Sequence, residues 1–470
     1  MRVEEEVCGV MLPSVEDTRA LSEVCYFIRE KLYGSASLLC DRTLHETPTE
    51  KRFIVLNAYC AIRLGKVSQA IRLLNAIKRD KDVGLAALCA LKLALHAEAT
   101  IDAVSLRDVE MEMNSVWNSA NATNCYLAGL VLMFEGMTER AATLVDRAIK
   151  EIPNNGVLAT LRGWLDVKTG KDIKEAMRLF DVGIRQDLPD ALLGKAKLYE
   201  SRHNVANMEM MVKAVLEKYP NFIPGHIEAV RCALTTRNIE NLNERLQNGN
   251  LVTSDCLILH IIELVKILVL QGDIASITSV LNDINDTVTA SENENPDYQL
   301  FLAQLLARIG FEHPSILQYC RKLLDRALTL ERKSSLLVEK SRLLLNDGDY
   351  KQARMLAMTA LEIDTDPDPS VLLGVVRCYI AEGNLSEAVA QVQFVRSVNA
   401  NIEKSMYFHF YQALIDRCQG KSADTILTGI RNATDILLSS VQVSFSRFSE
   451  NSVIRMYCRV FLLDWIICTR

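Results

Sequence analysis

The chain has 470 residues, of which 49% are hydrophobic, and it contains only 10 prolines and 20 glycines. This composition predicts a folded, helix-rich protein, and the length exceeds what a single compact core accommodates. The formal net charge is -6, with Lys and Arg interleaved with Asp and Glu, which excludes the basic stripe typical of nucleic-acid-binding proteins. We therefore expect several domains or one solenoid that grows by repetition.

The N-terminal residues 1–7 are acidic and lack the basic-then-apolar order of a secretory signal, so we expect cytosolic synthesis and retention. The 13 cysteines form no CxxC pair, and most lie among Leu, Ala and Val, as Cys60, Cys89 and Cys232 do. We interpret them as small buried side chains in a reducing compartment rather than as metal ligands or disulfides.

A glycine followed five residues later by an alanine recurs inside Leu-rich amphipathic stretches. The four pairs are Gly65 and Ala70, Gly136 and Ala141, Gly348 and Ala353, and Gly383 and Ala388. This recurrence predicts stacked helix-turn-helix repeats, which present extended surfaces to other proteins.

The clearest repeat spans residues 125–155. In it, Gly129 and Ala141 are small where the two helices cross, and Gly136 allows a left-handed turn between them. Ala148 meets the following repeat, and Pro153 ends the second helix. This spacing is typical of a tetratricopeptide repeat of about 34 residues.

Other repeats keep parts of the pattern, including one that is stretched by a residue between Gly170 and Ala176 and carries Phe180 as its aromatic residue. The residues that we predict to define the repeats are Gly65, Ala70, Gly129, Gly136, Ala141, Ala148, Pro153, Gly170, Ala176, Gly194, Gly272, Gly348, Ala353, Ala360, Gly383 and Ala388.

The predicted fold is all-α, a right-handed α-α superhelix of about ten helical pairs. We expect an N-terminal helical segment over 1–50, the repeat array over 51–435 and a divergent helical tail over 436–470. Acidic residues, Asn and Pro cluster at 289–296 and 364–369, which predicts surface loops there. The apolar stretch 460–468 is interrupted by Asp464 and is too short to span a bilayer, so we expect no membrane span.

No motif predicts catalysis, a cofactor or a metal site. Residues 163–171 end in Gly170 and Lys171, but a phosphate-binding loop needs four residues between its glycines and a Ser or Thr after the Lys. The seven histidines lack zinc-ligand spacing. Trp164 lies within a repeat between Leu161 and Val167, and we interpret it as a core residue.

Several stretches are more specific than the repeat consensus. They include Gly65-Lys66 with Ala76-Ile77-Lys78, Trp164-Leu165-Asp166 followed by Gly170-Lys171, and Ala191-Leu192-Leu193-Gly194-Lys195-Ala196. From about residue 20 to 435, the chain resembles the N-terminal part of the tetratricopeptide repeat protein 21 family, a subunit of intraflagellar transport complex A.

The resemblance implies a non-catalytic ciliary scaffold in the cytoplasm, the cilium and the ciliary base. Implied partners are other complex A subunits and, indirectly, the dynein-2 motor and ciliary membrane cargo, with no nucleic acid and no small-molecule substrate. The repeats alone leave a second interpretation open, an adaptor of a chaperone or ubiquitin-ligase assembly. A chaperone-type repeat would need a basic clamp for a peptide terminus, for which Asn57 and Lys66 are individually of the right type. An enzyme ranks third, since no segment is left over for a catalytic domain.

Members of that family continue with further repeats after the region that this chain matches. The last ten residues, 461–470, are apolar and lack an evident polar capping helix, with which a solenoid usually closes. We expect the chain to be a fragment, a short isoform or a gene-model truncation, and these three alternatives stay open.

Overall fold

The computed structural model describes residues 15–98, 102–170, 173–202, 204–236, 274–309, 313–363, 369–399 and 402–442. Within these ranges the chain is helical and contains no strand. The contacts divide it into two compact units, one comprising residues 1–259 with 284–295 and the other comprising 260–283 with 296–470. The predicted all-α repeat fold is confirmed, and each unit is described by itself.

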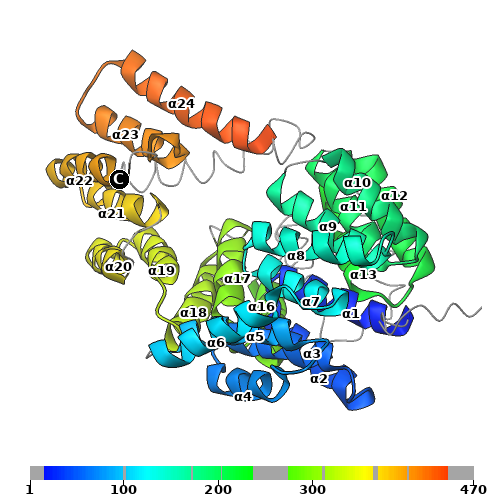
Figure 1. Cartoon of the computed structure of the whole chain (residues 1–470). Coiled ribbons are helices and arrows are strands. Elements are labelled where there is room, and N and C mark those ends of the chain that lie inside the picture. Colours follow the sequence, from blue (N-terminus) through cyan, green and yellow to red (C-terminus); the bar gives the residue numbers. More distant parts are fainter. Residues whose placement is uncertain are drawn as a thin grey trace, which may run out of the picture. The chain divides into compact units, whose positions relative to one another are not determined.

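Unit 1 begins with six successive helical pairs and the first helix of a seventh (Figure 1). Its helices are α1 (Val15–Arg29), α2 (Tyr33–Glu46), α3 (Lys51–Arg63), α4 (Val67–Ile77), α5 (Gly84–Ala97), α6 (Ala103–Trp117), α7 (Ala122–Phe134), α8 (Thr138–Glu151), α9 (Gly156–Thr169), α10 (Ile173–Arg185), α11 (Pro189–Ser201), α12 (Val205–Lys218) and α13 (Ile223–Thr236).

The described residues of unit 2 form four helical pairs, and in each pair the two helices are consecutive in the sequence. Its helices are α17 (Pro296–Ile309), α18 (Pro314–Leu330), α19 (Ser334–Asn346), α20 (Tyr350–Ile363), α21 (Pro369–Ala381), α22 (Leu385–Val398), the short 3-10 helix η1 (Ile402–Lys404), α23 (Met406–Cys418) and α24 (Ala423–Gln442). Helix α16 (Ile274–Ser291) precedes them, and its residues from Ile284 onward belong to unit 1.

We call the two helices of a pair the first and the second helix, in sequence order. They differ in burial because of their positions in the stack. In unit 1 the first helices α5, α7, α9 and α11 contact one another in succession as well as their second helices. Helix α5 is accordingly buried without a break from Gly84 to Leu91, whereas α8 buries only a stripe at Ala141, Leu144, Val145 and Ala148. A helix between neighbours is apolar all round, and one at the surface is amphipathic.

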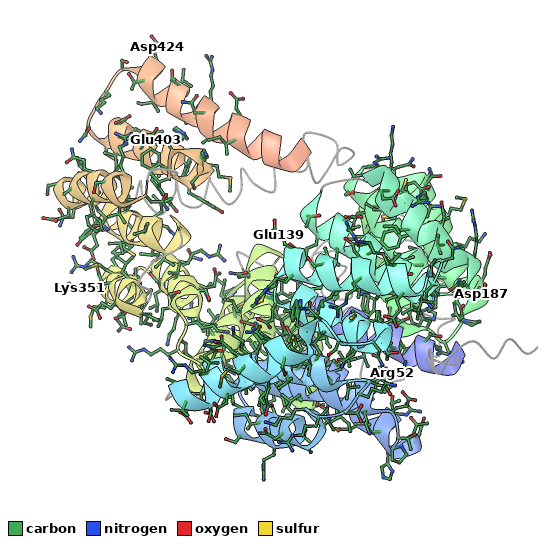
Figure 2. All side chains as sticks on the ribbon, viewed as in Figure 1. Arg52, Glu139, Asp187, Lys351, Glu403 and Asp424 are labelled. Carbon is green, nitrogen blue, oxygen red and sulfur yellow. The ribbon has the colours of Figure 1, made fainter. Side chains whose placement is uncertain are left out.

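The outside of both units is covered with charged side chains. Figure 2 shows Asp187, Lys351 and Asp424 projecting from turns and second helices, and all three are exposed. In the described ranges no helix is long and apolar enough to cross a membrane.

The repeat-defining residues occupy turns and helix crossings. The five turn glycines have φ between 64° and 81°, and each alanine has no exposed area. The glycines are Gly65, Gly136, Gly170, Gly348 and Gly383, and the alanines are Ala70, Ala141, Ala148, Ala176, Ala353, Ala360 and Ala388. Pro153 lies in the turn after α8, Gly129 and Gly194 lie within α7 and α11, and Gly272 lies outside the described residues.

One predicted loop is correct only in part, because residues 292–295 form a turn in which Asn293 and Glu294 are exposed. We expect 289–296 to be a surface loop, but α16 continues to Ser291, and the following Glu292 and Asn295 are 1% and 0% exposed. Their polar side chains are buried because they bond to the first helical pair. The other predicted loop, 364–369, falls almost entirely outside the described residues, and Pro369 begins α21. Most of the predicted tail, 443–470, lies outside them too.

The cysteines in the described ranges are free thiols. Eight of the nine are buried, and Cys418 is exposed. Burial raises the pKa of the Cys25, Cys89 and Cys320 thiols to about 12. The predicted burial is therefore confirmed for all described cysteines except Cys418.

The crossing of α9, α10 and α11 depends on two glycines around one aromatic ring. Phe180 of α10 is fully buried, and a Cβ at Gly194 would lie 2.3 Å from its ring, while a Cβ at Gly163 would lie 2.9 Å from it. Because the ring has no free space to move into, both glycines are required for this close approach.

We expect Gly194→Ala to lower the free energy of unfolding by about 2 kcal/mol, because the new methyl group overpacks the Phe180 site. The matched control is Gly374→Ala, since Gly374 is likewise the sixth residue of a first helix that begins with proline, and a Cβ there would lie 3.6 Å from Val338. The control should change stability by at most about 1 kcal/mol. Urea unfolding measures both variants, and equal effects would contradict the packing argument.

Thiol alkylation of the native protein at pH 8 should modify Cys418 at least about tenfold faster than Cys25, Cys89 or Cys320, because buried thiols are both inaccessible and protonated. Mass spectrometry of the digested protein gives the rate at each cysteine. After denaturation in urea these rates should converge, and rapid native modification of Cys25 would contradict the burial.

Candidate protein-binding surface

The inner row of unit 1 is the first place to look for a partner-binding groove. Helices α7, α9 and α11 contact one another in sequence and form a continuous inner layer, while α8, α10 and α12 pack behind them. In repeat solenoids, such an inner layer is a usual binding surface for peptides and helices.

Helix α1 occupies this interior. It contacts α2 and α3 on one side and α11 and α13 on another. Its residues from Val24 to Ile28 are at most 4% exposed, so this part of the helix is buried on every side. Continuous burial without an amphipathic period is typical of a helix inside a core rather than one on a surface.

A charged cluster fixes the C-terminal end of α1. Arg29 lies with its guanidinium carbon 4.1 Å from the ring centre of Trp164 in α9, and it donates to both carboxylate oxygens of Asp190 in α11. Trp164 also donates from Nε1 to Oδ2 of Asp190 at 2.9 Å. The two partners of the ion pair are each 15% exposed. Paired and hydrogen-bonded, these charges are tolerated at low exposure.

Electrostatics agree with this geometry. Burial opposes the positive charge of Arg29, but the neighbouring Asp190 outweighs it and raises the pKa of the guanidinium. Trp164 also packs edge-on against Phe180 at a centroid distance of 5.8 Å. The interpretation of Trp164 as a core residue therefore accounts for its packing but not for its hydrogen bond to Asp190. No local sequence pattern indicates this bond.

Two further anchors lie on the same side of α1. Tyr26 donates to Oε1 of Glu228 in α13 at 2.7 Å, and Arg19 donates to the carbonyl oxygen of Asn221, just before α13, at 2.7 Å. Arg19, Tyr26 and Arg29 recur at helical spacing, so one face of α1 carries all three anchors.

One cavity between α1 and the inner row is small. A cavity of about 30 Å³ is lined by Ser22 and Cys25 of α1, Tyr126 of α7, and Trp164 and Thr160 of α9. This volume suits a single water molecule and not a peptide. At this cavity, the inner row packs against α1 of the same chain.

Asn57 and Lys66, which are of the right type for a chaperone-like clamp, both have partners within the chain. Asn57 is 8% exposed, with its amide group donating to Asp41 at 2.6 Å and its oxygen accepting from Ser37. Lys66 pairs with Glu294 at 2.5 Å. Asn57 is therefore not free to hold a peptide carboxylate, whereas Lys66 is 45% exposed and its surface ion pair is weak.

Unit 2 exposes large apolar side chains on two second helices in neighbouring pairs. Met355 of α20 is 67% exposed and Met358 is 42% exposed, while Phe394 and Val398 of α22 are 51% and 53% exposed. Figure 1 shows α20 and α22 at the left. Each helix carries two of these side chains about one turn apart, and both helices pack against α21. Single exposed hydrophobic residues are ordinary, but Met and Phe are common in protein contacts. We call these four residues the outer apolar patch.

The search for a metal site in the described part of the chain finds no candidate. It contains no group of three or more His, Cys, Asp or Glu side chains arranged to hold a metal ion. His260 and Trp465 lie outside that part, as does the whole segment 237–273 between α13 and α16. Trp117 is half-buried beneath Arg140, at 5.6 Å from ring centre to guanidinium carbon.

Replacing Arg29 with Ala should lower the free energy of unfolding by about 3 kcal/mol, because the carboxylate of Asp190 would stay buried without its partner. Arg42→Ala in α2 is the control, since Arg42 pairs with Glu46 while 77% exposed and should change stability by about 0.5 kcal/mol or less. Chemical denaturation compares the two. A loss at Arg29 no larger than at Arg42 would contradict the anchoring role.

Two family models match most of the chain. The family model described as the tetratricopeptide repeat protein 21 N-terminal ARM repeat matches residues 24–243, and the model of the second ARM domain of the same protein matches residues 279–445. Among solved structures, yeast Tom70 aligns over 94% of this chain and 99% of its own, with a TM-score of 0.46 and 13% identity.

Three curated relatives illustrate the sequence similarity. The Caenorhabditis briggsae tetratricopeptide repeat protein 21 homolog is 26% identical over 91% of this chain, human protein 21B is 25% identical over 89%, and human protein 21A is 24% identical over 91%. The chain spans only 32% to 33% of the length of these relatives. With both repeat models matched in order, the chain belongs to the tetratricopeptide repeat protein 21 family, as the resemblance predicts.

Proposed function

We propose that this chain is a non-catalytic scaffold subunit of intraflagellar transport complex A. The scaffold role is supported by the paired-helix fold and by family membership. In this proposal the chain contributes to retrograde ciliary transport, cilium assembly and protein trafficking to the cilium. The observation that carries the proposal is the match of two consecutive family models over 24–243 and 279–445.

The proposed partners are other complex A subunits, and through them the dynein-2 motor and ciliary membrane cargo. The proposed location is the cytoplasm, the cilium and the ciliary base. Since α1 fills the interior of unit 1, we assign partner contacts to outer surfaces, and the outer apolar patch of unit 2 is the surface to test first. Burying exposed Met and Phe side chains against a partner supplies the usual driving force for association.

The tagged chain, expressed in ciliated cells, should copurify with other complex A subunits and localise to the cilium and its base. Quantitative proteomics of the purified material and microscopy measure the two outcomes. Copurification with chaperone or ubiquitin-ligase machinery, without ciliary proteins, would contradict the proposal and favour the alternative adaptor role.

Phe394→Asp should reduce recovery of those subunits by about tenfold, because a charge in an apolar interface is left without a partner. Gln393→Asp is the matched control, since Gln393 is the preceding residue of α22, is also exposed and is already polar. Successive helical residues point in different directions, so this control should leave recovery unchanged. Both variants should keep the parent unfolding midpoint. Equal recovery for the two variants would exclude the outer apolar patch as a contact. The scaffold proposal itself is tested separately, by the copurification experiment with the parent chain.

A further inference from the structure

The turn after α16 contacts the first helical pair through a buried carboxylate. Glu292 is 1% exposed, and its Oε2 accepts from the backbone N–H of Gly34 at 3.0 Å. Its Oε1 accepts from the backbone N–H and the hydroxyl of Ser35, both at 2.9 Å. The first N–H groups of a helix have no partner within the helix, so Glu292 satisfies the start of α2 from a segment 257 to 258 residues away.

Asn295 completes the contact. It is fully buried, and its Nδ2 donates to the carbonyl oxygen of Lys31 at 2.7 Å and to Oε2 of Glu292 at 2.8 Å. Lys31 lies in the turn between α1 and α2, with φ of 62°. The same short turn therefore holds both the start of α2 and the connection from α1.

The backbones also meet at this point. A Cβ at Gly34 would lie 1.8 Å from the carbonyl oxygen of Ser291, the last residue of α16. Any side chain at position 34 would force the two backbones apart, because the clashing atom belongs to the main chain and not to a flexible side chain. The contact thus has a steric component that is independent of the hydrogen bonds.

Helix α2 depends on this contact more than α1 does. Helix α1 also packs against α3, α11 and α13, whereas the main helix contacts of α2 are with α1 and α3. Segments with fewer packed neighbours open at lower free-energy cost than the rest of a structure. We propose that residues 291–295 act as a latch that holds the α1–α2 pair in unit 1, and that releasing the latch opens this pair while the inner pairs stay folded.

The chemistry at Glu292 makes an isosteric test possible. Four hydrogens point at its two oxygens, from Gly34, Ser35 twice and Asn295. A Glu292→Gln variant keeps the shape of the side chain but replaces one of its oxygens with an NH2 group. In either orientation of the amide, this NH2 group faces hydrogen-bond donors. The hydrogen bonds that the replaced oxygen accepts are therefore lost. Glu294, in the same turn, is 50% exposed and pairs with Lys66, so Glu294→Gln is the matched control.

The readout is the alkylation rate of individual cysteines in the native full chain. Cys25 and Cys40 lie in α1 and α2 and are 3% and 0% exposed, while Cys89 in α5 reports on an inner pair. We expect Glu292→Gln to raise the rates at Cys25 and Cys40 by about 10- to 100-fold, the effect of losing charged hydrogen bonds. Cys89 should change less than about twofold, and Glu294→Gln should leave all three rates as in the parent.

Gly34→Ala tests the steric component from the α2 side of the contact. It should likewise raise the alkylation rates of Cys25 and Cys40 and leave that of Cys89 nearly unchanged. If Glu292→Gln behaves like Glu294→Gln, the turn is not a latch. If both Glu292→Gln and Gly34→Ala raise the rate at Cys89 as much as at Cys40, the first pair does not open separately and the proposal is overturned.

Discussion

Every helical pair in this chain is too thin to bury its apolar faces alone, so each depends on an apolar neighbour on both sides. In the middle of unit 1 the neighbours are the preceding and following pairs, and the unbroken burial of α5 is the result. Helix α1 lacks a described predecessor and is buried instead by helices from the far end of the unit, α11 and α13. The interior that an open solenoid would offer to a partner is thereby filled by the chain itself.

Polar anchors matter for α1 because apolar packing alone does not fix how a helix is rotated or shifted along its axis. An Arg, a Trp and an Asp from three different helices converge at Arg29, and their planar groups accept only one relative arrangement. A buried ion pair contributes little net stability compared with well-packed hydrophobic residues, but it strongly disfavours misaligned states. The anchors therefore set the register of α1, while the apolar residues supply the driving force.

The fold was predictable from sequence because its signals are local. A turn glycine and the alanine five residues after it lie in one helical pair, and Gly136 with Ala141 shows both the left-handed turn and the close crossing. The contacts of α1 had no such signal, since Arg29 and Asp190 are 161 residues apart. The loop predicted at 289–296 is shorter and more buried than expected for the same reason. Glu292 and Asn295 have the composition of a loop, and only their distant partners explain their burial.

Filling the interior also changes where recognition can occur. A groove binder selects partners by the shape of its inner row, but the inner row of unit 1 is already matched to α1, with space for about one water molecule beside it. Displacing α1 would expose five consecutive buried residues and an ion pair, which makes competition by a partner helix unfavourable. Binding to the outer helices requires no helix to be displaced, because Met355, Met358 and Phe394 already face solvent. Association that buries them gains apolar contact without first unfolding anything, so the arrangement favours a scaffold that binds partners on its outside.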